Sequence, residues 1–434
     1  MTAHKHINRS ILAYFPETTV CQPPANWAAD GTSFEHLAVD VSGVKAQHIA
    51  DPTMEGTWAK GQGHRRRIKG HRNVDWSFRV KLHGVGVETA EDSQVAETYL
   101  ARLIRWCLGG VNRSYTREVV SSLNAYTLTV GAGLTTGFVV GACVAVEDTT
   151  SPNAQYEGKP ILRQIASVNA GTDTITLTEA LPFTPAAGDM IHATLTMFVD
   201  ETVLEDAVRN GSLHTMNFLH KRTRGQTDTL YQLEATVANL SIANLGKGQL
   251  PELSFACMSA NFKHSGEDDL TEPTFSSTVG YPQLSNGVDV MMSIADASST
   301  AADMQDVREV SFEPGIQRTR EETTTEVDDR FEGMATYSAT FGPAKFGVTL
   351  SGYSPEWYAG LKADTEYRLT LQQPGPGTGG GKGWGIIVPR AQLVATPTMQ
   401  IGNATLGTQL EWEAMLPSLA ATEIGTSPFV IALF

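Results

Sequence analysis

The chain carries many residue types that could do chemistry, but their spacing matches no known catalytic arrangement. Its eleven histidines include no H-E-x-x-H motif and no pair four residues apart, and no serine lies in a G-x-S-x-G elbow. Glu267-Asp268-Asp269 follows His264 and has metal-compatible chemistry, but it lacks the alternating spacing of a calcium loop, which favours a solvated linker. The sequence therefore predicts no catalytic, cofactor-binding or metal-binding residues and a protein that is not an enzyme.

A glycine-rich run from Gly375 to Gly383 invites comparison with a phosphate-binding loop. A P-loop needs a glycine five residues before the glycine of its Gly-Lys pair and a Ser or Thr after the lysine. This chain has Pro376 and Gly383 at those positions, so the run is better interpreted as the tip of a hairpin.

The strongest charge signal is a pair of short runs of opposite sign. The basic run contains Arg65, Arg66, Arg67, Lys69 and Arg72, and the acidic run contains Glu321, Glu322, Glu326, Asp328 and Asp329. A solvated loop is the usual role of one such run, and nucleic-acid contact is the minority alternative. Both runs precede the same repeated strand, so equivalent positions carry opposite charge. We therefore expect these residues to contact each other across an interface between subunits, or between stacked rings if the subunits form rings.

Composition limits the broad class of protein. The chain has 434 residues, of which 41% are hydrophobic and 18% charged, so it can bury a sizeable core and suggests two to four domains. Its net charge of −15 argues against general affinity for nucleic acid. The four cysteines lie far apart, which indicates reduced thiols in the cytoplasm, and no stretch is predicted to be a secretion signal or a membrane span.

The sequence contains an internal repeat. Phe78, Val80, Leu82 and Gly84 recur 268 residues later, and the pentapeptide at 232–236 recurs in similar form 160 residues later. The difference predicts 108 extra residues inside the first copy, between 84 and 232. A slip of three residues would instead match Leu253 and Phe255 to Leu410 and Trp412, and the sequence leaves that register open. Two similar units on one chain can occupy equivalent places in a symmetric assembly.

Periodicity predicts mostly β-structure around this repeat. Residues 74–82 and 346–350 alternate apolar and polar side chains, which is typical of a strand with one buried face. A helix is expected after each strand, over 89–108 in the first copy and after Ser354 in the second. Paired strands are then expected over 231–258 and 391–415.

The extra residues are expected to form a small β-barrel of their own over 119–199, because short apolar strands alternate there with glycine-rich turns. The predicted organisation is an N-terminal arm (1–33), a first domain (34–262) that carries this insertion, a linker (263–287) and a second domain (288–434). The fold class predicted is mainly β, with two tandem sandwich or barrel domains, each flanked by one helix.

With this layout the chain resembles the major tail (tail tube) proteins of long-tailed bacteriophages, in the variant with a duplicated tube domain. The resemblance covers about 34–262 and 288–434 and rests on the order strand, helix, strands, with a long loop ahead of each core strand. The inserted domain is similar to the exposed decorations of such proteins. Two alternatives remain: a ring protein of the tail tip or tail terminator, or a β-protein that binds host-surface carbohydrate through Trp27, Trp58, Trp357 and Trp384.

The resemblance implies a structural virion protein of the tail, assembled in the cytoplasm of a bacterial host. Its implied partner is chiefly itself, as trimeric, pseudo-hexameric rings stacked into a tube, together with the terminator, tail-tip and tape-measure proteins. Double-stranded DNA would pass through an acidic lumen without specific binding, because carboxylates give phosphates no fixed partner. No cofactor is expected.

Overall fold

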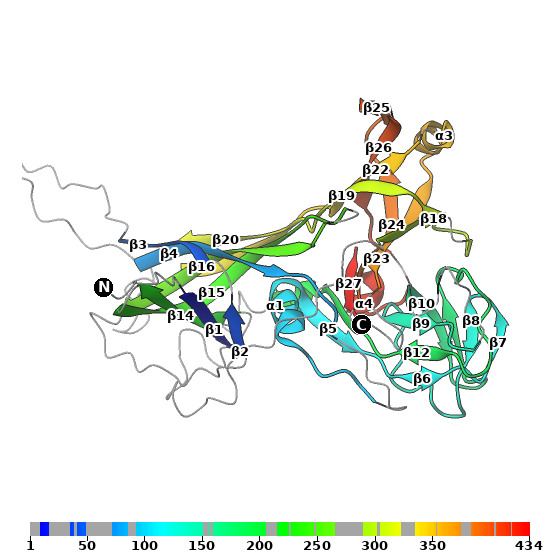
Figure 1. Cartoon of the computed structure of the whole chain (residues 1–434), viewed down its shortest axis with the longest axis horizontal. Coiled ribbons are helices and arrows are strands. Elements are labelled where there is room, and N and C mark those ends of the chain that lie inside the picture. The colour runs from blue at the N-terminus through cyan, green and yellow to red at the C-terminus, as the bar shows by residue number, and fades with distance from the viewer. Residues whose placement is uncertain are drawn as a thin grey trace, which may run out of the picture.

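The computed structural model of the chain describes residues 9–16, 35–38, 41–48, 72–85, 93–150, 156, 159–204, 215–224, 227–246, 249–264, 290–301, 304–322, 335–352, 354–374, 383–402, 405–417 and 419–434. The predicted mainly-β fold class is confirmed, since large antiparallel sheets dominate these residues (Figure 1). The linker predicted over 263–287 lies almost wholly outside them.

Seven strands of the first half pair in one antiparallel array. Their order is β2 (Glu35–Ala38), β1 (Arg9–Pro16), β14 (Met216–Arg224), β15 (Thr227–Ala243), β16 (Glu252–His264), β4 (Arg72–Lys81) and β3 (Val41–His48). β1 comes from the segment that the sequence assigned to an N-terminal arm. That segment therefore contributes a strand to the first unit.

The second half has the same order of strands. It runs β18 (Met304–Gln305), β17 (Met291–Asp296), β23 (Glu366–Gln373), β24 (Trp384–Leu393), β26 (Thr405–Ala414), β22 (Lys345–Ser351) and β19 (Val307–Glu313). After β24, the chain continues along β26 as β25 (Thr398–Gly402), so β24 and β25 together occupy the place of the long β15.

Strand register decides the question that the sequence left open. Val80 pairs with Leu253, and its repeat Val348 pairs with Leu410, so β16 and β26 correspond with an offset of 157. The three-residue slip is thus the correct register. The match at an offset of 160 is wrong. Gln232 pairs with Lys263 and Gln392 pairs with Glu413, but Lys263 and Glu413 are not counterparts at the offset of 157, so Gln232 and Gln392 lie at different places in their sheets. The excess in the first half, 268 minus 157, is 111 residues.

Aromatic side chains fill the core of the first half. Phe78 on β4 stacks on Phe255 of β16 with ring centroids 4.7 Å apart, and Phe218 on β14 meets Trp76 of β4 edge-on at 5.1 Å. Because β14 and β4 are not neighbours in the array, this contact shows that the array folds over and buries its aromatic face. Such close, offset contacts stabilise a core beyond simple burial.

The helix that covers this core is shorter than predicted. Helix α1 (Tyr99–Leu108) begins where the Thr98 hydroxyl accepts a hydrogen bond from the backbone N–H of Ala101, and it ends at Gly109, whose φ is 98°. The expected start at 89 is wrong for 93–98, because Gln94 bridges to Tyr115 instead. In the second half, α3 (Glu356–Lys362) follows Ser354 as predicted.

The inserted segment forms a second sheet that closes on itself. Its order is β6 (Arg117–Glu118), β12 (Met190–His192), β9 (Cys143–Glu147), β10 (Ile161–Asn169), β11 (Thr174–Leu177), β8 (Thr127–Thr129) and β7 (Ser121–Asn124). Only Val119 and Val120 separate the two end strands, β6 and β7. Their backbone N–H groups donate to Asp189, next to β12, and to Thr129 of β8, so the sheet closes into a small barrel. Leu128, Val146, Ile165 and Ile175 lie in its core.

The barrel is anchored in the second half, not displayed as a free decoration. Strands β5 (Gly109–Arg113) and β13 (Leu195–Val199) flank it, and the C-terminal strand β27 (Val430–Leu433) pairs with β13 on one edge and with β24 on the other. Met197, Ile431 and Ile386 lie side by side across the three strands. This sheet joins the insertion of the first half to the second half (Figure 1).

Candidate interaction surface

The predicted charged residues fall largely outside the described part of the chain. Arg65, Arg66, Arg67, Lys69, Glu326, Asp328 and Asp329 lie there. Arg72 is the first residue of β4, and Glu321 and Glu322 end β20 (Ile316–Glu322), which pairs with β21 (Ala335–Phe341) as a two-stranded arm of the second half. Contact between the two runs stays a prediction.

The structure does show where this arm lies: it runs along β15 of the first half. The side-chain amide of Asn239 accepts a hydrogen bond from the backbone N–H of Arg318 at 2.7 Å and donates one to the carbonyl of the same residue at 3.2 Å. The Tyr337 hydroxyl donates to the carbonyl of Ala235 at 2.7 Å. β19 pairs with the same strand through Phe312 and Ile242. These contacts between the two halves were not predicted from the sequence.

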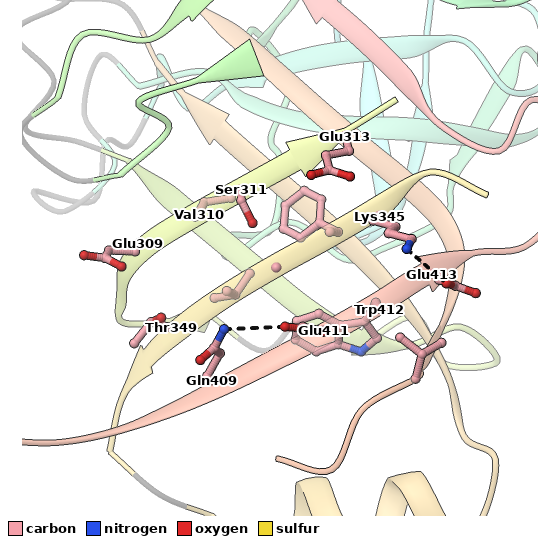
Figure 2. Close-up of a pocket in the computed structure, with 14 residues that line it drawn as sticks. Glu309, Val310, Ser311, Glu313, Lys345, Thr349, Gln409, Glu411, Trp412 and Glu413 are labelled. Atoms are coloured by element: carbon pink, nitrogen blue, oxygen red, sulfur yellow. Dashed lines mark hydrogen bonds and ion pairs between the residues drawn. The ribbon is translucent and has the colours of Figure 1, made fainter. Parts of the chain in front are cut away.

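The outward face of the second half is acidic. Alternation along β19, β22 and β26 places Phe346, Val348 and Trp412 in the core and turns the polar residues between them outward. Figure 2 shows polar residues of these three strands, among them Glu309, Glu313 and Glu411. The outward residues include four carboxylates and one cation: Glu309, Glu313, Glu411, Glu413 and Lys345. They border a shallow hollow of about 400 Å³.

A glycine, Gly347, is among the residues that line this hollow. A Cβ atom on Gly347 would lie 2.5 Å from the Ser311 hydroxyl oxygen, so a larger residue would displace that side chain. Lys345 reaches Glu413 at 3.9 Å, the limit of an ion pair, and Gln409 donates to Glu411 at 3.5 Å. Within the described residues no cation comes within ion-pair distance of Glu309, Glu313 or Glu411. The face therefore presents net negative charge to whatever covers it.

The corresponding face of the first half is less acidic. β4 and β16 turn two carboxylates, Asp75 and Glu252, and two cations, Arg79 and Lys81, outward, and Glu252 forms ion pairs with Arg79 at 3.3 Å and with Lys81 at 2.5 Å. By register, Ser254 and Ala256 stand where the second half has Glu411 and Glu413. The two faces share a backbone pattern but not a charge.

A buried polar cluster joins the barrel to the second half. Arg163 and Glu179, both of which lie in the barrel, are almost fully buried with their charged atoms 3.8 Å apart. Glu179 also accepts hydrogen bonds from Ser293 and Thr370 of the second half. Burial lowers the pKa of Arg163, and the nearby Glu179 carboxylate opposes that shift. Because the cluster is closed to solvent and its members bind each other, it serves as a joint between the two parts.

Other reactive groups are poorly placed for chemistry. Burial raises the pKa of the Cys107 and Cys143 thiols to about 12, which disfavours the nucleophilic thiolate. Among the described residues there is no group of three or more His, Cys, Asp or Glu side chains that could hold a metal ion. No helix in the same residues is long and apolar enough to cross a membrane.

Two of the four tryptophans proposed as carbohydrate platforms, Trp357 and Trp384, belong to the described residues. Trp384 is buried and donates to Gln373 at 2.8 Å, so it cannot serve as an exposed platform. Trp357 packs on Trp412 with ring centroids 6.2 Å apart. Trp27 and Trp58 lie outside the described residues.

Comparison with known proteins adds no assignment: no protein-family model matches the chain, and no curated protein matches it.

Proposed function

We propose that the chain is a structural protein of a phage tail tube, in which three chains form each ring and the rings stack into a conduit for DNA. The proposal rests on a seven-strand order that occurs twice. One array has β2 and β3 as its end strands, and the other has β18 and β19. Two similar units on one chain allow three chains to fill six similar places around an axis.

The acidic face supports a position at the lumen. Glu309, Glu313 and Glu411 point away from the core and have no ion-pair partner in the described residues. Carboxylates there would repel DNA phosphates and let the duplex slide, since retention of DNA depends on Lys and Arg contacts. In the proposed ring this acidic face alternates with the more basic face that carries Arg79 and Lys81.

Electron microscopy of the purified full-length chain tests the proposal, with mass photometry to count chains per particle. We expect hollow tubes or stacked rings, and particles whose mass is a multiple of three chains. Single rings that never stack would favour the tail-terminator or tail-tip alternative. A chain that remains monomeric at high concentration would contradict both.

A further inference from the structure

We propose that the outer edge of β24–β25 in one chain receives strand β3 of a second copy of this chain. The inference rests on the proposed function, because it specifies the contact that would join neighbouring chains within a ring. A similar contact already exists inside the chain, where β19 of the second half lies along β15 of the first half.

The contact within the chain supplies the template. β19 is the edge strand of the second array, since it pairs with β22 and is followed in sequence by the arm. Its Phe312 pairs with Ile242 at the outer edge of β15, and Asn239 on β15 binds both backbone groups of Arg318 as the arm continues. The edge strand β19 of one unit thus lies along the free part of β15 in the other unit.

The counterparts of both partners are present. β3 pairs with β4 through Val41 and Phe78, as β19 pairs with β22 through Phe312 and Phe346, so β3 is the counterpart of β19. β24–β25 flanks β26 as β15 flanks β16. The repeated order therefore provides a second donor strand and a second receiving edge.

The receiving edge is open in the described structure. From Val394 to Gly402 the described residues pair only with β26, and Val394 and Met399 are 49% and 58% exposed. Exposed apolar residues on an unpaired strand edge are unusual in a chain that works alone, because such an edge readily pairs with another strand. Pairing with β3 would cover both.

A side-chain amide marks the same place on both edges. Asn239 lies opposite Ala256, and Gln392 lies opposite Glu413, the register counterpart of Ala256. Gln392 is partly exposed and binds the carbonyl of Asp364 at 3.2 Å. The backbone of Gln392 still pairs with Glu366 of β23, so its amide lies at the end of the open edge, where the amide oxygen can accept a hydrogen bond from an incoming strand.

Charge favours the same occupant. The basic residues Arg65, Arg66, Arg67 and Lys69 follow β3 in the sequence, and the receiving half presents Glu411 and Glu413 on the strand beside Gln392. Complementary charge orients the approach and makes association weaken as salt rises. The contact is head to tail, so one pair of surfaces joins every chain to the next.

Cysteine cross-linking of the full-length chain tests the contact. In the pair Phe312–Ile242, the counterpart of Phe312 is Val41. Ile242 pairs with Leu253, whose counterpart is Leu410, and Leu410 lies between the partners of Val394 and Thr398. The counterpart of Ile242 is therefore one of residues 395–397 in the neighbouring chain. We would combine Val41→Cys with Ala395→Cys, and separately with Thr396→Cys, to allow for a one-residue difference in register. Directly paired strands hold Cα atoms close enough for a disulfide.

We expect at least one double variant to form interchain disulfides up to a covalent trimer in a non-reducing gel, and reductant to remove them. Each single variant and the matched double variant Val41→Cys/Val120→Cys, whose second cysteine lies on the barrel, should form no such ladder. Rings or tubes that assemble without interchain cross-links in either double variant would overturn this contact and leave the proposed function standing. A native chain that does not self-associate would overturn both.

Discussion

The two halves of the molecule share a strand order but differ in what they present outward. On β4 and β16 of the first half, Arg79 and Lys81 balance Asp75 and Glu252, whereas on the equivalent strands β22 and β26 one lysine, Lys345, accompanies Glu411 and Glu413. The inward residues are alike in kind, with Phe78 and Phe255 on one side and Phe346 and Trp412 on the other. Core packing therefore fixes the scaffold, and the outward face is free to take a charge that suits its position in an assembly.

A second difference lies in which strands pair along the long central strand of each half. In the first half β15 pairs with β16 from Tyr231 to Ala243, whereas in the second half β26 pairs with only the last three residues of β24. β27 pairs with the first four residues of β24 and also with β13, next to the insertion. The second half thus depends on the insertion, and the predictions below separate the two halves on this basis.

The largest effect is expected at the joint between the barrel and the second half. Arg163→Ala would remove the guanidinium 3.8 Å from the buried Glu179 carboxylate, and loss of one partner of a buried pair costs about 3–5 kcal/mol of unfolding free energy. Arg79→Ala, in an exposed pair of the first half, should cost at most about 1 kcal/mol. Urea denaturation followed by fluorescence measures both, and equal losses would contradict the asymmetry.

The amide pair provides the next comparison. Asn239→Ala would leave the backbone N–H and carbonyl of Arg318 without their partners in the partly buried arm contact, which we expect to cost about 1–3 kcal/mol of unfolding free energy. Gln392→Ala should leave that free energy nearly unchanged and instead weaken association between chains. Denaturation and sedimentation of both variants test this, and a Gln392 variant that only unfolds more readily would count against its proposed role.

The two buried tryptophans give a smaller difference. Trp76 donates to the Ser259 hydroxyl at 2.9 Å, whereas the indole N–H of Trp412 has no acceptor among the described residues. Replacement of Trp76 by Phe removes a hydrogen bond, whereas replacement of Trp412 by Phe removes a donor that has no acceptor among the described residues. We expect Trp76→Phe to lower the unfolding free energy by about 1 kcal/mol more than Trp412→Phe does, and the opposite order in denaturation curves would refute this.

The smallest expected effect is on the free energy of unfolding at acidic pH. Two hydrogen bonds from Arg390, at 2.6 and 2.7 Å, lower the pKa of Glu366 in the folded second half. A carboxyl with a lowered folded-state pKa stabilises the fold above its unfolded pKa, and that contribution is lost as pH falls through the folded value. Glu366→Gln should therefore flatten the acid side of the stability profile slightly, and an unchanged profile would show that the exposed pair contributes nothing measurable.

Alternation and local repeats made part of this structure predictable. The spacing of Trp76, Phe78 and Val80 predicted strand β4 and its buried face. The short apolar runs of the insertion predicted the strands that form the barrel. Both patterns depend only on neighbours in the sequence. The match at an offset of 160 failed because five similar residues can recur in a strand of another register, and hydrogen-bonded pairing alone decides between registers.

The interaction surfaces depend on long-range placement and could not be predicted. The contact of Asn239 with Arg318 joins residues 79 positions apart, and Arg163 with Glu179 is completed by residues from the second half. β27 is a short apolar segment whose two partners come from different halves. An acidic face was expected from the net charge, but its location required the register of three strands.

Cryo-microscopy of the assembled protein tests the central claim most directly, because it counts chains and places each half. The account predicts rings of three chains in which the two halves alternate around a hollow lumen, with the barrel appearing three times per ring. Six full chains per ring, or halves that do not occupy equivalent places around the axis, would contradict it.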